Sequence, residues 1–237
     1  MRARWGYFLL VIGIVVLAWG CRSSDHSPAH QHQMNTPAAD QENPANRHMH
    51  RVPFDTLVQR FEAPEREKWQ KPDLVIEQMG DLSDKVVADI GAGTGYFAFR
   101  IAQKAKKVIA IDIDERFLNY IEQKNAAREE PLPIETRKVP PDDPQLSKGE
   151  ADIVLLVDTY HHIENRPEYF ARVREKLPPD GLLMIVDFKK EEMPVGPPMD
   201  IKLSPETVVA ELKQAGYQSV EVDTQLLPYQ YIVTARP

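Results

Sequence analysis

Short apolar segments that alternate with helical patterns constrain the fold of this chain more than any other feature. The apolar segments cover residues 85–90, 107–111, 151–157 and 182–186, and helical spacing of apolar residues follows at 115–128 and 167–177. The segments at 151–157 and 182–186 are almost continuously aliphatic, which is typical of parallel strands that helices cover on both faces. We therefore predict an α/β fold with a doubly wound sheet.

The last part of the chain predicts a different kind of strand pair. Residues 218–226 and 229–235 both have strand character, and only Leu227 and Pro228 separate them. Such a short link does not allow a parallel crossover, so this pair is expected to be an antiparallel hairpin. With a weaker strand at 133–139, the sequence predicts a mostly parallel seven-stranded sheet that ends in the hairpin.

The N-terminus has the features of a targeting signal. Arg2 and Arg4 precede an apolar run from Trp5 to Ala18, and a small residue, Gly20, stands before Cys21, the only cysteine of the chain. This resembles a bacterial lipoprotein signal, which implies that residues 1–21 are a signal peptide and that Cys21 is the lipid anchor. The alternative is an uncleaved membrane anchor. Both place the domain in the cell envelope, facing the periplasm or the exterior.

A polar segment follows the signal. Residues 22–50 are rich in Ser, Pro, Gln, Asn and His and contain almost no aliphatic side chains, so we predict a disordered tether and a single domain at 51–237. The tether contains five histidines, but no cluster of carboxylates or cysteines accompanies them at the spacing of a metal site. We predict no metal.

The formal net charge of −7 limits the partners of this domain. Binding to DNA or RNA depends on lysine and arginine side chains that neutralise phosphates, so we predict no nucleic-acid partner. Small-molecule or protein substrates remain, of which we expect a small-molecule acceptor, and contact with the membrane is expected only through the N-terminal lipid or anchor.

Candidate ligand-binding residues follow the first two predicted strands. In the segment Asp89-Ile-Gly-Ala-Gly-Thr-Gly95, the glycines allow a sharp turn and a close approach of the backbone to a ligand. Asp112 ends the second strand and lies beside this turn if the strands are parallel neighbours. A carboxylate in that position can accept hydrogen bonds from both hydroxyls of a ribose. The combination predicts a nucleoside-binding site.

The spacing Gly91-x-Gly93-x-Gly95, with Asp89 two residues before it, resembles the first motif of class I S-adenosylmethionine-dependent methyltransferases. A carboxylate at this position attracts a cationic sulfonium cofactor and repels a dinucleotide pyrophosphate. The resemblance extends over residues 65–236 and implies S-adenosylmethionine as cofactor. The cofactor-binding residues that it implies are Asp89, Gly91, Ala92, Gly93, Thr94, Gly95, Asp112, Ile113, Asp142 and Asp158. At the adenine contact, Asp143 is an equal alternative to Asp142.

The fourth predicted strand is followed by a histidine pair that resembles a segment of many small-molecule methyltransferases. The reaction implied is in-line displacement of the methyl group by a nucleophile of the acceptor, with a base where the acceptor must lose a proton. His161 and His162 are the candidate catalytic residues, since the ordinary histidine pKa is close to neutral. Alternatively, the pair caps or packs, and Asp158 caps the following helix.

Two other functional classes remain as alternatives. A catalytically degenerate nucleoside-binding module on the envelope would have a damaged cofactor loop, whereas Asp89, Gly91, Gly93 and Asp112 are intact. An NAD-dependent oxidoreductase would need the spacing Gly-x-Gly-x-x-Gly and usually a separate substrate domain, and neither is found.

Overall fold

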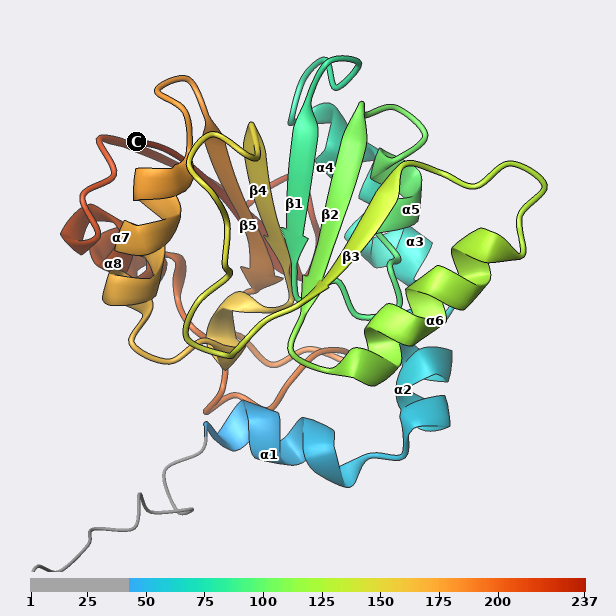
Figure 1. The fold of residues 1–237 in the computed structure, drawn as a ribbon. Coiled ribbons are helices and arrows are strands. Elements are labelled where there is room, and N and C mark those ends of the chain that lie inside the picture. Colours follow the sequence, from blue (N-terminus) through green and yellow to red (C-terminus); the bar gives the residue numbers. More distant parts are fainter. Residues whose placement is uncertain (1–42) are drawn as a thin grey trace, which may run out of the picture. The chain divides into compact units, whose positions relative to one another are not determined.

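The computed structural model describes residues 43–237, which form a seven-stranded sheet with helices on both of its faces (Figure 1). The strand order is β3-β2-β1-β4-β5-β7-β6. Strands β1 to β5 are parallel, and β7 is antiparallel to both β5 and β6. The strands are β1 (Val86–Ile90), β2 (Lys107–Asp112), β3 (Ile134–Lys138), β4 (Ile153–Val157), β5 (Leu182–Phe188), β6 (Ser219–Asp223) and β7 (Gln230–Arg236). This confirms the predicted α/β class, the mostly parallel sheet and the C-terminal antiparallel hairpin.

Two apolar clusters hold the helices against the sheet, one on each face. One cluster contains Phe170 and Val173 of α7 and Leu212 of α8. The other contains Ile76 of α4 and Ile101 of α5. The α-helices are α1 (Pro44–Arg51), α2 (Phe54–Phe61), α3 (Arg66–Gln70), α4 (Pro72–Glu77), α5 (Ala98–Ile101), α6 (Glu115–Ala126), α7 (Arg166–Lys176) and α8 (Pro205–Gln214). The central strands are therefore buried on both sides, as their aliphatic sequence requires.

The carboxyl edge of the sheet is where a ligand site is expected. The strand β1 lies between β2 and β4, so the chain leaves β1 towards one side of the sheet for β2 and crosses to the other side for β4. In open α/β sheets, this reversal leaves a crevice at the carboxyl ends of the strands. A short 3-10 helix, η1 (Tyr160–His162), follows β4 at the same edge.

Helix α1 was not expected from the sequence. Its residues, Pro44–Arg51, lie almost entirely within the segment that we assigned to the tether, and α1 lies near the carboxyl ends of the strands (Figure 1). The domain boundary expected at residue 51 is therefore too late in the chain. The signal peptide, Cys21 and the tether up to residue 42 lie outside the described residues. Within residues 43–237, no helix has the length and apolar character needed to cross a membrane.

Candidate functional site

The glycine loop after β1 is pressed against the ends of two neighbouring strands. The backbone N–H groups of Gly91 and Ala92 donate to the carbonyl of Ile111 on β2, at 2.8 and 3.1 Å. Gly91 has φ +74°, and a Cβ atom added there would lie 2.9 Å from the Cβ of Thr159 and closer still to its other side-chain atoms. Only glycine fits this turn, and the loop consequently presents bare backbone to the crevice.

Asp112 lies directly against this loop. Its Oδ2 accepts a hydrogen bond from the backbone N–H of Gly93 at 2.9 Å, and its Oδ1 accepts one from Asp114 at 2.9 Å. Burial raises the pKa of Asp112 to about 6. Next to it, Ile113 is one of the few large apolar side chains that are exposed, at 41%. The predicted neighbourhood of the glycine loop, Asp112 and Ile113 is therefore present.

Asp89 is buried in β1, and its Oδ2 atom has no hydrogen-bond partner within the described part of the chain. Burial, and in addition the charge of nearby Asp112, raise the pKa of Asp89 to about 7. Burying a carboxylate without a charged or hydrogen-bonding partner costs roughly several kcal/mol. A cationic ligand group that pairs with it offsets that cost. The unpartnered Oδ2 atom of Asp89 therefore fits a ligand that carries a positive charge.

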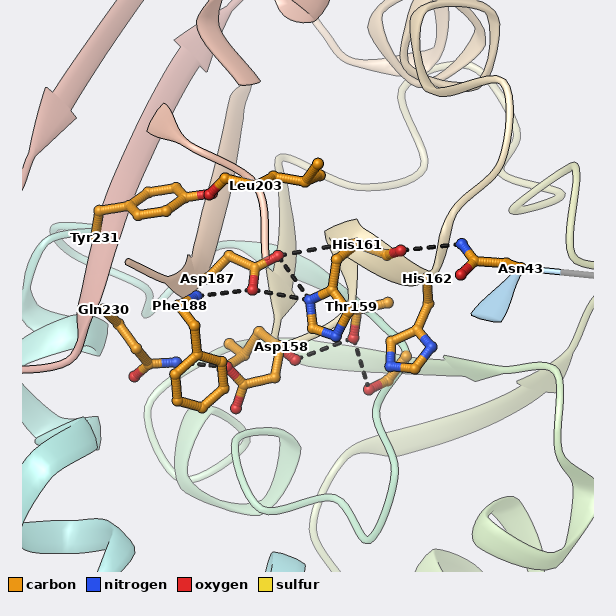
Figure 2. A network of polar contacts seen from close by, with 12 residues as sticks. Asn43, Asp158, Thr159, His161, His162, Asp187, Phe188, Leu203, Gln230 and Tyr231 are labelled. Atoms are coloured by element: carbon orange, nitrogen blue, oxygen red, sulfur yellow. Dashed lines mark hydrogen bonds and ion pairs between the residues drawn. The ribbon is translucent and has the colours of Figure 1, made fainter. Parts of the chain in front are cut away.

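Asp158 follows β4 and is held from three sides. It has φ +56°, which is rare for a residue other than glycine. The amides of Gln70 and Gln230, which are both fully buried, donate to its carboxylate, and Arg66 lies 3.7 Å from Oδ2. Burial raises the pKa of Asp158 to about 6, although Arg66 lowers it. Asp158 thus belongs to a polar network at the site (Figure 2).

His161 is paired with a carboxylate that sequence reasoning did not assign to the site. Its Nδ1 lies 2.9 and 3.0 Å from the two carboxylate oxygens of Asp187, near the end of β5, and the two side chains are only 4% and 1% exposed (Figure 2). Burial lowers the pKa of His161, but the charge and the hydrogen bond of Asp187, together with the charge of Asp158, outweigh it, so that the pKa is raised overall. The backbone N–H of His161 also donates to Asp187, and not to Asp158.

His162 contacts a different part of the chain. Its Nδ1 lies 2.8 Å from Oδ1 of Asn46 in α1, and its ring centroid is 4.4 Å from that of His161. His162 is half-buried, whereas His161 is buried. The two predicted catalytic candidates are therefore neighbours at the carboxyl edge, each with Nδ1 facing an oxygen atom.

Asp142 is the predicted residue for which the structure shows no side-chain contact with the site. It is exposed after β3, and its backbone carbonyl accepts a hydrogen bond from Arg172 of α7 at 2.8 Å. The alternative residue, Asp143, accepts from the backbone N–H of Gln145 at 2.8 Å. The adenine contact therefore stays a prediction. Within residues 43–237, no three His, Cys, Asp or Glu side chains are grouped to hold a metal ion.

Among the site residues that the sequence analysis did not assign, Asp187 had a signal in the sequence, whereas Gln70 and Asn46 had none. Asp187 follows an aliphatic run, and the parallel register pairs Val157 with Val186, so it had to lie beside Asp158. Gln70 and Asn46 are single polar residues in helices that have no apolar repeat to fix their direction.

Comparisons with known proteins agree with this geometry. Residues 88–185 match the family described as a methyltransferase domain. The chain is 29% identical over 106 residues to a ubiquinone biosynthesis O-methyltransferase from Acinetobacter baylyi, covering 44% of each protein. It is 27% identical over 124 residues to a tRNA U34 carboxymethyltransferase from Actinobacillus succinogenes, covering 50% of this chain and 36% of that protein. The matched segments thus span less than half the length of these curated relatives.

A solved structure extends the likeness to the fold. A SAM-dependent methyltransferase from Aquifex aeolicus superposes with a TM-score of 0.70 at 24% identity, covering 78% of this chain and 98% of that one. The chain therefore has the Rossmann-like fold of these methyltransferases. The matched family segment contains the glycine loop, Asp112, Asp158 and both histidines, which supports the resemblance found in the sequence.

Proposed function

We propose that this chain is an S-adenosylmethionine-dependent methyltransferase that acts on a small-molecule acceptor by in-line displacement. The observation that carries the proposal is the buried Oδ2 atom of Asp89, which has no partner in the described chain and lies in the strand that leads into the glycine loop. Asp112 closes the other side of that loop through its bond to Gly93. The family match at 88–185 supports the same activity.

The residues of this site fit the cofactor by charge and by shape. Asp89 would pair with its ammonium group, the backbone from Gly91 to Gly95 would lie against its methionine part, and Asp112 would accept from its ribose hydroxyls. The exposed side chain of Ile113 offers an apolar surface beside Asp112 for the adenine ring of the cofactor. When bound, S-adenosylmethionine supplies a methyl group that a sulfonium cation activates. The carboxylates of Asp89, Asp112, Asp158 and Asp187 favour such a cation at this edge.

The chain's own contribution to the chemistry is positioning and proton transfer. The donor is already activated, so orientation of the acceptor supplies most of the rate. His161 and His162 lie at the ends of the strands where an acceptor proton can be received, and the charge of Asp187 stabilises a protonated His161.

A small molecule fits this chain better as acceptor than a nucleic acid does. The curated relatives include an O-methyltransferase of ubiquinone biosynthesis and a tRNA carboxymethyltransferase. The net charge of −7 and the carboxylates at the site oppose the approach of an RNA backbone. For the acceptor, the likeness to the ubiquinone biosynthesis O-methyltransferase is therefore more relevant than the likeness to the tRNA carboxymethyltransferase.

The cofactor is tested by calorimetric titration of the full chain with S-adenosylmethionine, alongside Asp112→Ala and a matched surface variant, Asp84→Ala. We expect micromolar binding to the unaltered chain. Loss of the hydroxyl contacts of Asp112 should weaken it by about 10- to 100-fold, since hydrogen bonds to charged groups contribute roughly 1.5–3 kcal/mol. Asp84 is exposed, pairs with Lys85 and stands before the start of β1, at the opposite end of this strand from the glycine loop, so its variant should bind normally.

Two results would contradict the proposal. One is the absence of heat and of any thermal stabilisation with S-adenosylmethionine while the chain is folded. The other is equal binding by the unaltered chain and by Asp112→Ala. Tight binding of NADH instead would favour the oxidoreductase alternative.

We further propose that the protein is anchored to the cell envelope by a lipid on Cys21. The support is the order of features in the sequence: a basic start, an apolar run and a small residue before the only cysteine. These residues lie outside the described part of the structure.

A further inference from the structure

The two histidines of the site end a short 3-10 helix whose last carbonyl groups need partners. At the end of a helix, the final carbonyls have no intrahelical donor. Here the carbonyl of His161 accepts from Nδ2 of Asn43 at 3.0 Å, and the carbonyl of His162 accepts from Nδ2 of Asn46 at 3.2 Å. Helix α1, which begins at Pro44, and its N-cap Asn43 therefore supply the donors for η1 across 116 and 118 residues of chain.

These bonds determine which way the amide of Asn46 points. A backbone carbonyl can only accept, so the NH₂ group of Asn46 must face the carbonyl of His162. Its Oδ1 atom then faces the ring of the same histidine, 2.8 Å from Nδ1. An amide oxygen can only accept, so Nδ1 of His162 must carry a hydrogen in this arrangement. One asparagine thus fixes both the backbone and the tautomer of His162.

His161 has the same tautomer for a different reason. The carboxylate of Asp187 accepts from its Nδ1, so the lone pair of each neutral ring is on Nε2. Asp187 belongs to the sheet, whereas Asn46 belongs to a helix at the start of the described chain. The orientation of His161 is therefore set by the core of the fold, and that of His162 by the docking of α1.

We propose that Asn46 is a positioning residue that holds His162 with hydrogen on Nδ1 and its lone pair on Nε2, the form that can receive a proton from the acceptor. His162 is half-buried while the side chain of His161 is only 4% exposed, which makes His162 the more accessible base. In this step, the bond between hydrogen and the acceptor oxygen or nitrogen breaks, a new N–H bond forms at Nε2, and the electron pair stays on the acceptor atom. The role as base rests on the proposed function, but the tautomer does not.

The tautomer can be measured directly by NMR. The full chain in detergent micelles, labelled with ¹⁵N-histidine, is observed by long-range ¹H–¹⁵N correlation well above the ordinary pKa of histidine, and His162→Gln assigns the signals. We expect a single tautomer of His162 with hydrogen on Nδ1. Asn46→Ala removes the acceptor and should give a mixture of both tautomers. Asn46→Asp keeps an oxygen at the ring and should restore the single form.

Asn43→Ala is the matched control, because it removes the bond to the carbonyl of His161 and leaves the ring contact of His162 intact. It should retain the single tautomer. The proposal is overturned if the unaltered chain carries hydrogen on Nε2 of His162, if Asn46→Ala leaves the spectrum unchanged, or if Asn43→Ala disturbs it equally. Titration of the same samples with S-adenosylmethionine tests the proposed function separately, and Asn46→Ala should bind the cofactor like the unaltered chain.

Discussion

Asp89 and Asp112 are two buried carboxylates on neighbouring strands, and both are easier to protonate than a carboxylate in water. Burial is the main cause for each, and the charge of Asp112 acts on Asp89 in addition. A ligand cation stabilises only their ionised forms. Binding of such a ligand is therefore coupled to the release of protons from this pair.

This coupling predicts that the affinity for S-adenosylmethionine depends on pH. The pKa of Asp89 is raised to about 7 in the free protein, and a bound ammonium group lowers it, so affinity is highest above that value. As pH falls through about 7, Asp89 must lose a proton to bind, and affinity should fall by about tenfold per pH unit for one proton. Calorimetry between pH 5.5 and 8.5, in buffers of different ionisation enthalpy, measures both affinity and proton release.

Asp89→Asn is the control for this prediction, since an amide has a similar shape and does not titrate. At high pH, the variant should bind S-adenosylmethionine more weakly than the unaltered chain does. As the pH is lowered, its affinity should begin to fall only near pH 6, where Asp112 becomes protonated. An identical pH profile in the variant and the unaltered chain would show that another group is responsible.

The proximity of Asp112 to the glycine loop was predictable, because both stand at the ends of recognisable strands and parallel neighbours end at the same edge of a sheet. The histidine pair was found as a candidate for the same reason. Their partners were not assigned: Asp187, 26 residues from His161, is placed only once β4 and β5 are paired in register, and Asn46, 116 residues from His162, has no such signal. Pairings at such distances depend on how helices and strands pack, which local patterns do not specify.

The turn between β1 and α5 depends on Gly91 more than on any helix or strand propensity around it. Its φ of +74° disfavours other residues, and a Cβ atom there would overlap the side chain of Thr159. The backbone conformation and the overlap together should cost roughly 2–5 kcal/mol in the free energy of unfolding of Gly91→Ala. Urea denaturation of the unaltered chain and the variant measures this loss.

Gly80→Ala separates the cost of the backbone conformation from the cost of steric overlap. Gly80 has φ +80°, but a Cβ atom there would have no other atom within 4 Å. This variant should therefore lose only the conformational part, about 1–2 kcal/mol. Equal losses of unfolding free energy in Gly80→Ala and Gly91→Ala would mean that Thr159 moves aside and that the loop is not tightly packed around Gly91.

Most helices and strands were predictable from their apolar periodicity, and α8 also from its cap. Ser204 accepts from the backbone N–H of Thr207, and Pro205 occupies the first turn. Helix α1 was not predictable, because its sequence PANRHMHR contains no aliphatic stripe. Its Asn43 cap is a local contact, but the polar contacts that hold it against η1 are tertiary interactions. The domain boundary was misplaced for this reason.

The parallel part of the sheet and its antiparallel end followed from general rules of chain connection, whereas the strand order comes from the structure. Aliphatic runs separated by helices give parallel neighbours, and the two-residue link before β7 excludes a crossover. The proposed N-terminal signal lies outside the described residues and stays a prediction from the sequence.

Lipid attachment predicts how the whole protein is distributed in a bacterial host. The full chain, expressed with radiolabelled palmitate, should carry label and sediment with membranes, because a lipid on Cys21 anchors it. Cys21→Ser should lose the label and leave the membrane fraction. Retention of unlabelled Cys21→Ser in membranes, with an intact N-terminus, would instead indicate an uncleaved anchor.

The antiparallel direction of β7 determines at which edge of the sheet the C-terminus lies. Gln230, the first residue of β7, pairs with Phe188 at the carboxyl edge of β5, and Ala235 pairs with Leu183 at the opposite edge. The C-terminus therefore points away from the site, while Asn43 touches His161 directly. An affinity tag or fluorescent fusion added after Pro237 would start at the edge of the sheet opposite to the histidines, whereas one that replaces residues 1–42 would start beside His161.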